Sequence, residues 1–362
     1  MADKYKLLAN KLELELRKMR SSGTHKLPSE QDLCKQYSCS RQTVRAALDV
    51  LRQKGLIVKR TGSGSYIADT AFINRSVYFM TEDVDKYLSP TLIAELKAYL
   101  SSSRYDLLTF STEGRISNET RILQQVIKEH PAALIIEPLR DIIPNPNNRM
   151  IEEIISSGIP VIYCNYSNTP SGAVHVAPDN RKGASLLVRR LAELGKKNIA
   201  CIFRMDDSTG LDRYSGYIDT LAELDLPFDE HRCLLLSYKD KKGTLIGNDR
   251  IISQYAAIIT SGVDAVVCQN DMVAYHLMEV LIRKGIKVPD DITIASFDNS
   301  YYAQRGAGFI SLGYEEGSLA KALARTAVAA AEGRAVKDVT IPWKFRVNTP
   351  SRRSKPDPDQ PK

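Results

Sequence analysis

Apolar residues near the start of the chain recur at the spacing of short helices. A helix is predicted over residues 3–21, where leucines lie four residues apart along one face. These leucines are Leu8, Leu12 and Leu16. A later helix is predicted between Ser40 and Gly55, because apolar residues recur there at intervals of four and three. The apolar face of that helix is made by Val44, Leu48 and Leu51.

Polar residues at two helix starts add to this pattern. Ser29 precedes two acidic residues, so it is predicted to cap a short helix whose first turn is acidic, as a helix N-terminus prefers. Ser40 is in the corresponding position for the helix that follows. In that second helix Arg41 and Arg45 are four residues apart, so they lie one turn apart on the face opposite the apolar one.

Two short strands around a glycine turn follow these helices. Residues 56–58 and 66–67 are apolar or aromatic and flank the sequence Thr-Gly-Ser-Gly at 61–64, which predicts a β-hairpin. Glycine lets a backbone approach a phosphate group closely, and Lys59 and Arg60 stand directly before the turn.

A short helix, a tight turn, an arginine-bearing helix and a basic hairpin are the parts of a winged helix-turn-helix. The second helix of such a unit lies in the major groove, where an arginine can bond guanine O6 and N7 together. The alternative is a solvated amphipathic helix with two surface arginines. Either arginine alone fits that alternative, but the combination of caps, apolar face, paired arginines and hairpin favours DNA binding.

The first 69 residues resemble the GntR family of bacterial repressors. The family's motifs are present as Leu27-Pro28-Ser29-Glu30, Ser40-Arg41-Gln42-Thr43-Val44-Arg45-Ala46-Ala47-Leu48 and Gly62-Ser63-Gly64-Ser65-Tyr66-Ile67. The resemblance implies that Glu30, Arg41 and Arg45 contact bases. The other predicted DNA-binding residues are Ser29, Ser40, Gln42, Thr43, Lys59, Arg60, Gly62 and Gly64.

From Ser76 onward short apolar runs alternate with amphipathic helices. About ten strand-like runs are present, with helices between them such as those predicted over 212–224 and 247–261. Buried runs that alternate with helices predict parallel, doubly wound sheets. Because ten strands are more than one sheet usually carries, two lobes with a cleft between them are expected. The predicted fold class is α/β, with an N-terminal winged helix-turn-helix and a two-lobed, doubly wound α/β domain.

Four segments follow from these patterns. They are a DNA-binding domain over 1–69, a linker over 70–75, a two-lobed domain over 76–349 that binds an effector and dimerises, and a tail over 350–362. The tail is rich in proline and charge, which predicts disorder.

Charge separates the first domain from the rest of the chain. The formal net charge of the 362 residues is +7. Residues 1–69 hold 14 Lys and Arg against 7 Asp and Glu, whereas the remaining residues hold 36 of each. This is the charge pattern of a phosphate-binding module joined to a neutral one. No apolar run is long enough to span a bilayer and the N-terminus has no signal-peptide pattern, so a cytoplasmic protein without a membrane partner is expected.

The cysteines and histidines do not predict a metal site. None of the six cysteines forms a C-x-x-C pair, and the five histidines are scattered along the chain. We expect all six thiols to be reduced and structural, with no metal and no cofactor.

Polar residues follow many of the predicted strands, at the end where ligands of parallel sheets bind. Carboxylates, amides and guanidinium groups suit a neutral polyhydroxylated ligand, because each hydroxyl both donates and accepts a hydrogen bond. The candidates among these residues are Tyr87, Glu137, Arg204, Asp206, Asn270 and Asp298. The ring of Tyr87 would cover an apolar face of the ligand. Asp179 and Asp271 open helices, so capping is their expected role.

A sugar-modifying enzyme with a DNA-binding head is one alternative. Paired carboxylates such as Asp206 and Asp207 can perform acid–base chemistry. However, no histidine lies at a strand end beside a nucleophile, and the first strand is followed by acidic residues rather than a Gly-rich phosphate loop. We therefore expect no enzyme. A second alternative is a body that only dimerises, with a cleft filled by its own side chains.

Residues 76–349 resemble the effector domain of the LacI/galactose-repressor family, which is itself similar to periplasmic sugar-binding proteins. The matching pieces occur in the family's order at 133–137, 158–161, 179–183, 213–217, 264–271, 288–292 and 297–299. The resemblance implies that Arg213, Asn270 and Asp298 bond ligand hydroxyls. It also implies that Glu137 completes the pocket from the other lobe.

Together the two resemblances imply a sugar-responsive transcriptional repressor. Such a protein binds a palindromic operator as a homodimer and is released by a sugar held between its lobes. The expected partners are double-stranded operator DNA, a second copy of the chain, and a pentose or hexose with L-arabinose as the first candidate.

Overall fold

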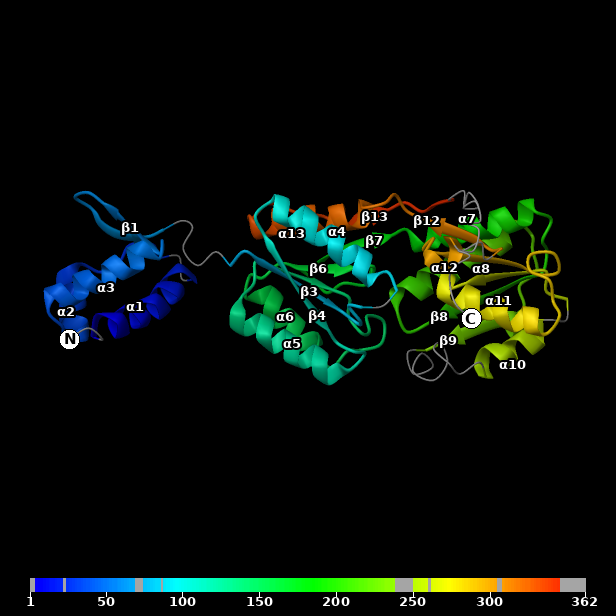
Figure 1. The fold of residues 1–362 in the computed structure, drawn as a ribbon, viewed down its shortest axis with the longest axis horizontal. Helices are drawn as coiled ribbons and strands as arrows, with labels where there is room; N and C mark the ends of the chain where they lie inside the picture. The colour runs from blue at the N-terminus through cyan, green and yellow to red at the C-terminus, as the bar shows by residue number, and fades with distance from the viewer. Residues whose placement is uncertain are drawn as a thin grey trace, which may run out of the picture. The chain divides into compact units, whose positions relative to one another are not determined.

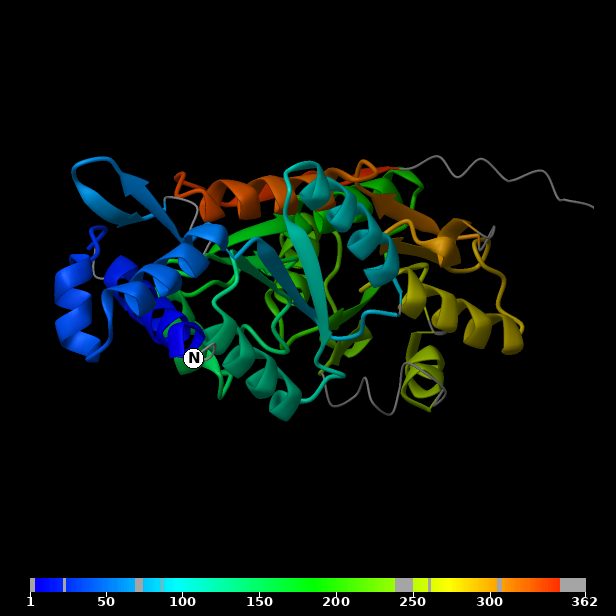
Figure 2. The same ribbon diagram turned by 60° about the vertical axis from the view of Figure 1, so that its left-hand side comes forward.

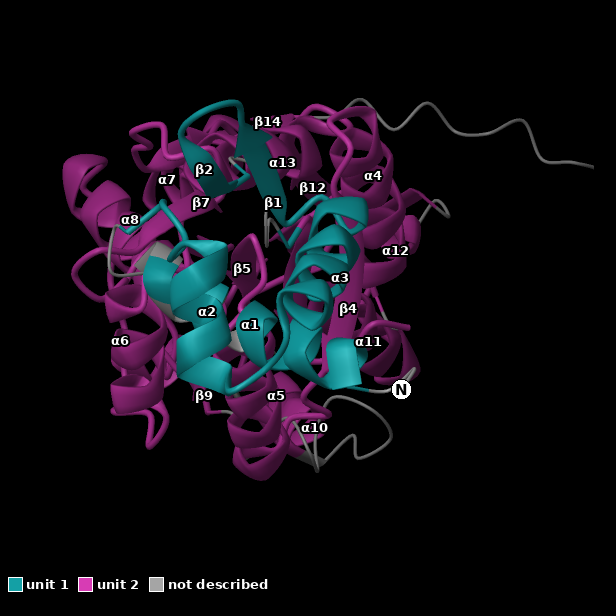
Figure 3. Cartoon of the chain, turned by 90° about the vertical axis from the view of Figure 1, so that its left-hand side faces the viewer, with its two compact units in different colours: residues 1–74 teal, residues 75–362 magenta. Residues whose placement is uncertain are grey.

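The computed structural model describes residues 4–21, 24–68, 74–85, 87–237, 250–259, 262–304 and 308–345. The chain divides into two compact units, unit 1 up to Asn74 and unit 2 from Arg75 (Figure 3). Most of the predicted linker and the whole predicted tail at 350–362 lie outside the described residues.

Unit 1 contains three helices and a hairpin, as the sequence predicts (Figure 1). Its elements are α1 (Lys4–Ser21), α2 (Glu30–Tyr37), α3 (Arg41–Gln53), β1 (Ile57–Arg60) and β2 (Gly64–Ile67). The predicted apolar faces are confirmed, because the leucines of α1 and the apolar residues of α3 are buried in one core. Its members include Leu8, Leu12, Leu16, Leu33, Val44, Leu48 and Leu51.

Two serine caps fix where the second and third helices begin, and both predicted caps are confirmed. The Ser29 hydroxyl accepts a hydrogen bond from the Asp32 backbone N–H at 3.2 Å, and the Asp32 carboxylate accepts one in return from the Ser29 N–H. The Ser40 hydroxyl accepts from the Thr43 N–H at 3.2 Å. Each cap satisfies a backbone donor that the helix itself leaves free, which is worth about 1 kcal/mol.

Unit 2 contains two six-stranded sheets, one in each lobe (Figure 1). The first sheet has the order β13-β7-β6-β5-β3-β4. Its strands are β3 (Ser76–Thr81), β4 (Asp106–Ser111), β5 (Ala133–Ile136), β6 (Val161–Cys164), β7 (Val174–Pro178) and β13 (Val339–Ile341). The second sheet has the order β14-β12-β11-β10-β8-β9. Its strands are β8 (Ile199–Arg204), β9 (Cys233–Leu236), β10 (Ala265–Cys268), β11 (Thr293–Phe297), β12 (Ile310–Gly313) and β14 (Lys344–Phe345).

Helices cover both faces of each sheet, as expected for doubly wound lobes. In the first lobe α4 (Ser89–Ser102) and α13 (Ser318–Ala331) pack on one face, and α5 (Ile116–Glu129) and α6 (Asn148–Ser156) on the other (Figure 2). The second lobe is covered by two pairs in the same way. These are α7 (Asn180–Glu193) with α8 (Ser208–Glu223), and α10 (Arg250–Ile259) with α11 (Asp271–Arg283). Two short helical segments, η1 (Glu230–Arg232) and α12 (Tyr301–Gln304), complete this lobe.

Within the described residues, the chain passes between the lobes three times. It crosses from β7 to α7, from β12 to α13 and from β13 to β14, where Trp343 lies between the last two strands. The sequence did not predict these two strands, because they are three and two residues long and carry no apolar run. The single antiparallel pairing of the second sheet, β12 with β14, arises from this last crossing.

The start of α8 also differs from the prediction of a helix over 212–224. The helix begins at Ser208 because the Asp207 carboxylate accepts a hydrogen bond from the Gly210 N–H at 2.7 Å. This cap adds a first turn that the apolar spacing alone does not reveal. The predicted helix over 247–261 is present as α10, and its predicted ends lie outside the described residues.

Candidate functional site

The arginine-bearing face of α3 is exposed. Arg41, Gln42 and Arg45 point to solvent, whereas Val44 and Ala47 on the opposite face are buried. The helix therefore offers two guanidinium groups and an amide from its first two turns, which is the part of a recognition helix that reaches base edges.

Glu30 and Arg45 are joined across α2 and α3. The Arg45 Nε donates to a Glu30 carboxylate oxygen at 2.8 Å, and the two side chains are 68% and 33% exposed. The sequence singled out both residues for DNA contacts but did not reveal that they pair with each other. The pair orients the guanidinium group without burying it.

The hairpin is a defined wing. Its strands pair in antiparallel register from Ile57 with Ile67 to Arg60 with Gly64. Gly62 and Gly64 have φ of 74° and 113°, conformations that residues with a Cβ rarely adopt, so the turn depends on glycine. The Arg60 guanidinium lies 4.6 Å from the centre of the Tyr66 ring.

The remaining predicted DNA-binding residues are also accessible. Ser29, Ser40, Lys59, Arg60, Gly62 and Gly64 are exposed, and Thr43 is half-buried. Ser29, Ser40 and Thr43 act in the helix caps. The hydroxyl and backbone donors of this surface are suited to phosphate contacts, which position a protein on DNA.

A cavity of about 1740 Å³ lies between the two lobes of unit 2, and we call it the interlobe cleft. Six of the seven predicted ligand-binding residues line it. They are Tyr87, Glu137, Arg204, Arg213, Asn270 and Asp298. Asp206 is not among the lining residues. The cleft is open rather than collapsed, because its volume exceeds the 300–1,000 Å³ typical of small-ligand sites.

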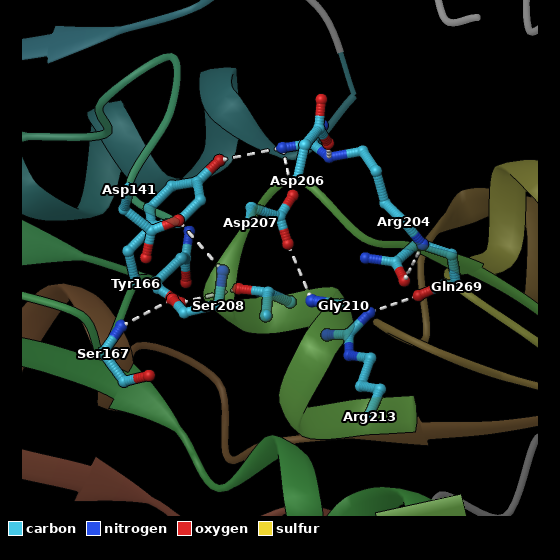
Figure 4. A network of polar contacts seen from close by, with 12 residues as sticks. Asp141, Tyr166, Ser167, Arg204, Asp206, Asp207, Ser208, Gly210, Arg213 and Gln269 are labelled. Atoms are coloured by element: carbon cyan, nitrogen blue, oxygen red, sulfur yellow. Dashed lines mark hydrogen bonds and ion pairs between the residues drawn. The ribbon is translucent and has the colours of Figure 1, made fainter. Parts of the chain in front are cut away.

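Asp206 has a different role from the predicted one. It is buried, and its carboxylate lies 3.3 Å from the Arg204 Nε, while Asp207 pairs with the other end of the same guanidinium group (Figure 4). Burial lowers the pKa of Arg204, but the two carboxylates and Tyr166 more than offset this and raise it. Arg204 thus reaches the cleft with its charge already balanced.

The Arg213 side chain, at the base of the cleft, is held by hydrogen bonds and by two aromatic rings. Its Nε donates to the Asn180 side-chain oxygen at 3.0 Å and its Nη1 donates to the Gln269 carbonyl oxygen. The guanidinium lies 4.0 Å from the centre of the Phe297 ring and 5.5 Å from that of Trp343. Burial lowers the pKa of Arg213, and the nearby Asp298 opposes that change. These contacts leave little freedom, so its orientation is set before any ligand arrives.

Glu137 faces the cleft from the first lobe, directly after β5. Its carboxylate accepts hydrogen bonds from the Thr81 hydroxyl and from the Asn165 amide at 2.6 Å. Burial raises the pKa of Glu137, whereas these hydrogen bonds lower it. The carboxylate is therefore positioned by two neighbouring strand ends.

The sequence suggested Asp271 as the cap of α11, but the preceding residue takes that role and also lines the cleft. Asn270 is the cap of α11, and its side-chain oxygen accepts from the Val273 N–H at 3.0 Å. Asp271 is fully buried and accepts hydrogen bonds from Ser296, Ser311 and Ser300. It therefore anchors the loop after β11 rather than capping the helix. Burial raises the pKa of Asp271 to about 7.

Asp298 is the first residue of that anchored loop. Its φ is 99°, and its N–H donates to the Leu312 carbonyl oxygen at 2.7 Å. Its carboxylate accepts a hydrogen bond from the Tyr87 hydroxyl of the other lobe at 2.5 Å. Burial raises the pKa of Asp298, and both Arg213 and Tyr87 oppose that shift.

Several lining residues were not selected from the sequence. Tyr166, Gln269, Tyr314 and Trp343 all line the cleft. Tyr314 and Trp343 lie in the chain crossings between lobes, and their rings are 5.4 Å apart. Residues in such crossings belong to no long strand or helix, so periodicity gives no signal for them.

No metal centre is formed by the side chains that the structure describes. Within that part of the chain, no three His, Cys, Asp or Glu residues are grouped so that they could hold a metal ion. All six cysteines are free thiols. Every described helix is too short or too polar to cross a bilayer.

A winged DNA-binding unit joined to a two-lobed body with a polar cleft defines the class of ligand-responsive transcription regulators. Residues 77–335 match the periplasmic binding protein domain, and residues 4–67 match the gntR family of bacterial regulatory proteins. The chain belongs to the periplasmic-binding-protein domain family and carries a gntR-type head. Both resemblances drawn from the sequence are thereby confirmed.

Two similar proteins are arabinose metabolism transcriptional repressors. The one from Halalkalibacterium halodurans is 27% identical over 284 residues, which covers 76% of this chain and 75% of that protein. The one from Geobacillus stearothermophilus is 29% identical over 282 residues, which covers 77% of each. These relatives are regulators, which confirms the prediction that the chain is not an enzyme.

Solved structures confirm the fold. The transcriptional regulator CelR in its cellobiose complex superposes with a TM-score of 0.66 at 18% identity, covering 85% of this chain and 90% of that one. The regulator CcpA of Lactococcus lactis has the same TM-score and identity, covering 76% of this chain and 98% of that one.

Proposed function

We propose that the protein is a transcriptional repressor that binds operator DNA through unit 1 and a small sugar in the interlobe cleft. The observation that carries this proposal is the polar lining of that cleft. Glu137 supplies an acceptor from one lobe, and Arg213 and Asp298 supply donors and an acceptor from the other. A hydroxyl both donates and accepts, so a polyol matches this set. The names of the two arabinose repressors make L-arabinose the first sugar to test.

A sugar held by both lobes would favour a closed arrangement of the body. The lobes are already linked on one side of the cleft at the start of α8 (Figure 4). There the Ser208 N–H donates to Asp141 at 2.9 Å and the Ser208 hydroxyl accepts from the Ser167 N–H at 3.0 Å. Together with the three chain crossings, these contacts already hold the two lobes against each other, and a sugar bound by both lobes would add to them.

In this proposal the protein acts as a homodimer on a palindromic operator. Two winged units then reach major-groove faces about 34 Å apart, one turn of DNA. Closure of the bodies changes the spacing of the heads, and a coupling of about 1–3 kcal/mol suffices to lower operator affinity 5- to 150-fold.

The proposal is tested by measuring DNA binding and then the release of DNA when a sugar is added. An operator is first selected from a random duplex pool with the full-length protein, and binding is followed by fluorescence anisotropy at fixed salt. L-arabinose, D-xylose, D-ribose, D-galactose and D-glucose are then added. We expect at least one of them to lower operator affinity and to raise the melting temperature of the protein.

Arg213→Ala serves as the control for the site. This variant should bind the operator as the wild type does, because unit 1 is unchanged. The same sugar should no longer release it from the operator, because a side chain that lines the cleft has been removed. If the wild type binds no duplex, or if no sugar alters its binding or melting, the proposed function is wrong.

A further inference from the structure

The interlobe cleft contains a hydrogen bond between the lobes that the protein makes with its own side chains. The Tyr87 hydroxyl, from the loop between β3 and α4, donates to Asp298 beyond β11 at 2.5 Å. Asp298 is one of the residues proposed to hold the sugar. A phenol that donates to a carboxylate makes the same kind of bond as a sugar hydroxyl would make.

The aromatic ring of Tyr87, like its hydroxyl, contacts the second lobe. Its centre lies 6.3 Å from that of Tyr302, which in turn lies 5.3 Å from that of Tyr275. Both partners belong to the second lobe, in α12 and α11. The Tyr87 backbone has φ of 55°, a left-handed conformation that is uncommon for tyrosine. Ring contacts and the hydrogen bond together account for this side chain standing in the cleft.

Asp298 cannot readily move away from the phenol. Its own N–H is bonded to Leu312, and the loop behind it is anchored where Asp271 accepts from the Ser300 N–H at 2.6 Å. The acceptor position is therefore fixed, and the hydroxyl that fills it is the part that can be exchanged. Burial and the Asp298 charge raise the pKa of the Tyr87 phenol, so it keeps its proton and stays a donor at neutral pH.

The charge of the cleft restricts what can replace the phenol. Nine carboxylate residues line the cleft against two arginines. The carboxylates are Glu82, Asp83, Asp85, Glu95, Glu137, Asp207, Asp298, Glu315 and Glu316. Arg204 is balanced by Asp206 and Asp207, and Arg213 lies beside Asp298. Five helices, α4, α7, α8, α11 and α13, also begin at the cleft and add about half a positive charge each, so the nine carboxylates still outweigh the positive charge.

We propose that the Tyr87 hydroxyl is an internal stand-in for a ligand hydroxyl, and that the effector is an uncharged polyol without a phosphate or carboxylate group. One hydroxyl of the effector replaces the phenol on Asp298. A carboxylate or dianionic phosphate group has no proton to donate to Asp298, and the surrounding carboxylates repel a ligand that carries such a group even when its remaining hydroxyls can donate. This inference rests on the proposed function, because it concerns the ligand of the same cleft.

The stand-in sets the sugar concentration at which the protein responds. Every binding event must break the bond between Tyr87 and Asp298, so part of the interaction with the sugar is cancelled. A hydrogen bond to a charged group contributes about 1.5 kcal/mol or more, which corresponds to roughly tenfold in affinity. Removing the phenol oxygen while keeping the ring should therefore make the sugar bind more tightly.

Tyr87→Phe tests this competition directly. The chain has one tryptophan, Trp343, which lines the cleft beside Arg213, so its fluorescence reports binding. For the sugar that acts on the wild type, we expect the dissociation constant of the variant to be about tenfold lower. Tyr105→Phe removes a hydroxyl from a tyrosine that does not line the cleft, and should leave the constant unchanged. A thermal melt of each variant checks that it is folded.

An unchanged or higher dissociation constant in Tyr87→Phe would overturn the proposal, because the phenol would then be a bystander or a direct ligand contact. The second arm compares each free sugar with its monophosphate on the wild type. We expect the phosphate to bind at least about tenfold more weakly, given the like charges within a few ångströms. A phosphate that binds as well as its parent sugar would also overturn it.

The two proposals fail in different ways. If neither sugars nor their phosphates alter fluorescence, melting or DNA binding of the wild type, the proposed function is wrong and this inference falls with it. If a sugar acts on the wild type but Tyr87→Phe binds it no more tightly, the repressor function stands and only the stand-in is refuted.

Discussion

At the scale of single residues, the cleft depends on buried groups that hold others in place. Arg213 is orientated by Asn180 and Gln269, and Asp298 by the loop that Asp271 anchors. Asn180 and Gln269 line the cleft themselves, whereas Asp271 does not. All three remove freedom from Arg213 or Asp298, which lowers the entropy lost on binding.

Asp271 is expected to make stability depend on pH. Its pKa is about 7 in the folded protein against an ordinary value of 3.8, so between these values the folded state binds the proton more tightly. Unfolding releases that proton, and the contribution of Asp271 to stability is therefore full below about pH 4 and is lost as pH rises to about 7. Asp271→Asn should remove this part of the pH dependence, which is on the order of 2–4 kcal/mol in the free energy of unfolding.

The measurement is the denaturation midpoint in urea between pH 4 and pH 8. The slope against pH should be flatter in Asp271→Asn than in the wild type, whatever the absolute stability of the variant. Asp290→Asn changes an exposed carboxylate and should keep the wild-type slope. Identical slopes in all three proteins would refute the role given to Asp271.

At the scale of elements, contacts between neighbouring helices and strands position the interlobe cleft and the DNA-binding face. The helices α7 and α8 pack closely at Gly216, where an added Cβ would lie 2.0 Å from the Arg181 carbonyl oxygen. Because α8 carries Arg213 and its capped end joins the lobes, this approach sets the position of the cleft base. On unit 1, the ion pair of Glu30 with Arg45 and the wing present the cationic face.

Gly216→Ala is expected to destabilise unit 2 by about 3 kcal/mol, because backbone atoms rather than a flexible side chain must move. Chemical denaturation followed by circular dichroism measures this change. Ser215→Ala, next to it on α8, should cost far less, because Ser215 is only half-buried and its hydroxyl bonds the Leu211 carbonyl oxygen of its own helix. A Gly216→Ala protein as stable as the wild type would show that α7 and α8 can separate freely.

Arg45→Ala and Lys59→Ala are expected to weaken DNA binding in different ways. Arg45 is proposed to read a base, so its loss should cost about 1–3 kcal/mol on the selected operator and little on random DNA. Lys59 is proposed to contact phosphate, so its loss should weaken both duplexes alike and reduce the salt slope by about one. Salt titrations of both variants on both duplexes separate these roles, and matching behaviour would contradict the assignment.

At the scale of the whole molecule, charge and ligand chemistry are divided between the units. Residues 1–69 carry a formal excess of seven positive charges and the remaining residues carry none. The interlobe cleft lies entirely in unit 2 and is rich in carboxylates. In the proposed function, the phosphates of DNA therefore contact unit 1, and the small uncharged ligand binds in unit 2.

Calorimetric melting should show that the sugar binds to unit 2 and the DNA to unit 1. A sugar at about 100 times its dissociation constant should stabilise unit 2 by about 2.7 kcal/mol, whereas an operator duplex should act first on unit 1. We expect the sugar to raise the transition of unit 2 and to leave that of unit 1 in place. A sugar-induced shift confined to unit 1 would contradict the placement of the ligand site.

Local chemistry was enough to predict the winged unit and the alternating lobes. Caps, helical spacing and the glycine turn involve residues close together in the chain, so they determine Ser29, Ser40 and the hairpin without reference to distant segments. The polar strand ends likewise identified Glu137, Arg204 and Asp298, because parallel strands bring their carboxyl ends to one edge.

Long-range packing decided the rest. Asp206 proved to be the counter-ion of Arg204 rather than a ligand contact, and Asp271 proved to be a buried anchor. Tyr87 meets Asp298 across 211 positions of sequence. Which of two adjacent carboxylates turns inward depends on the packing of helices and on chain crossings that bring remote residues together. Burial and hydrogen-bond partners set these choices, and neither can be read from spacing along the chain.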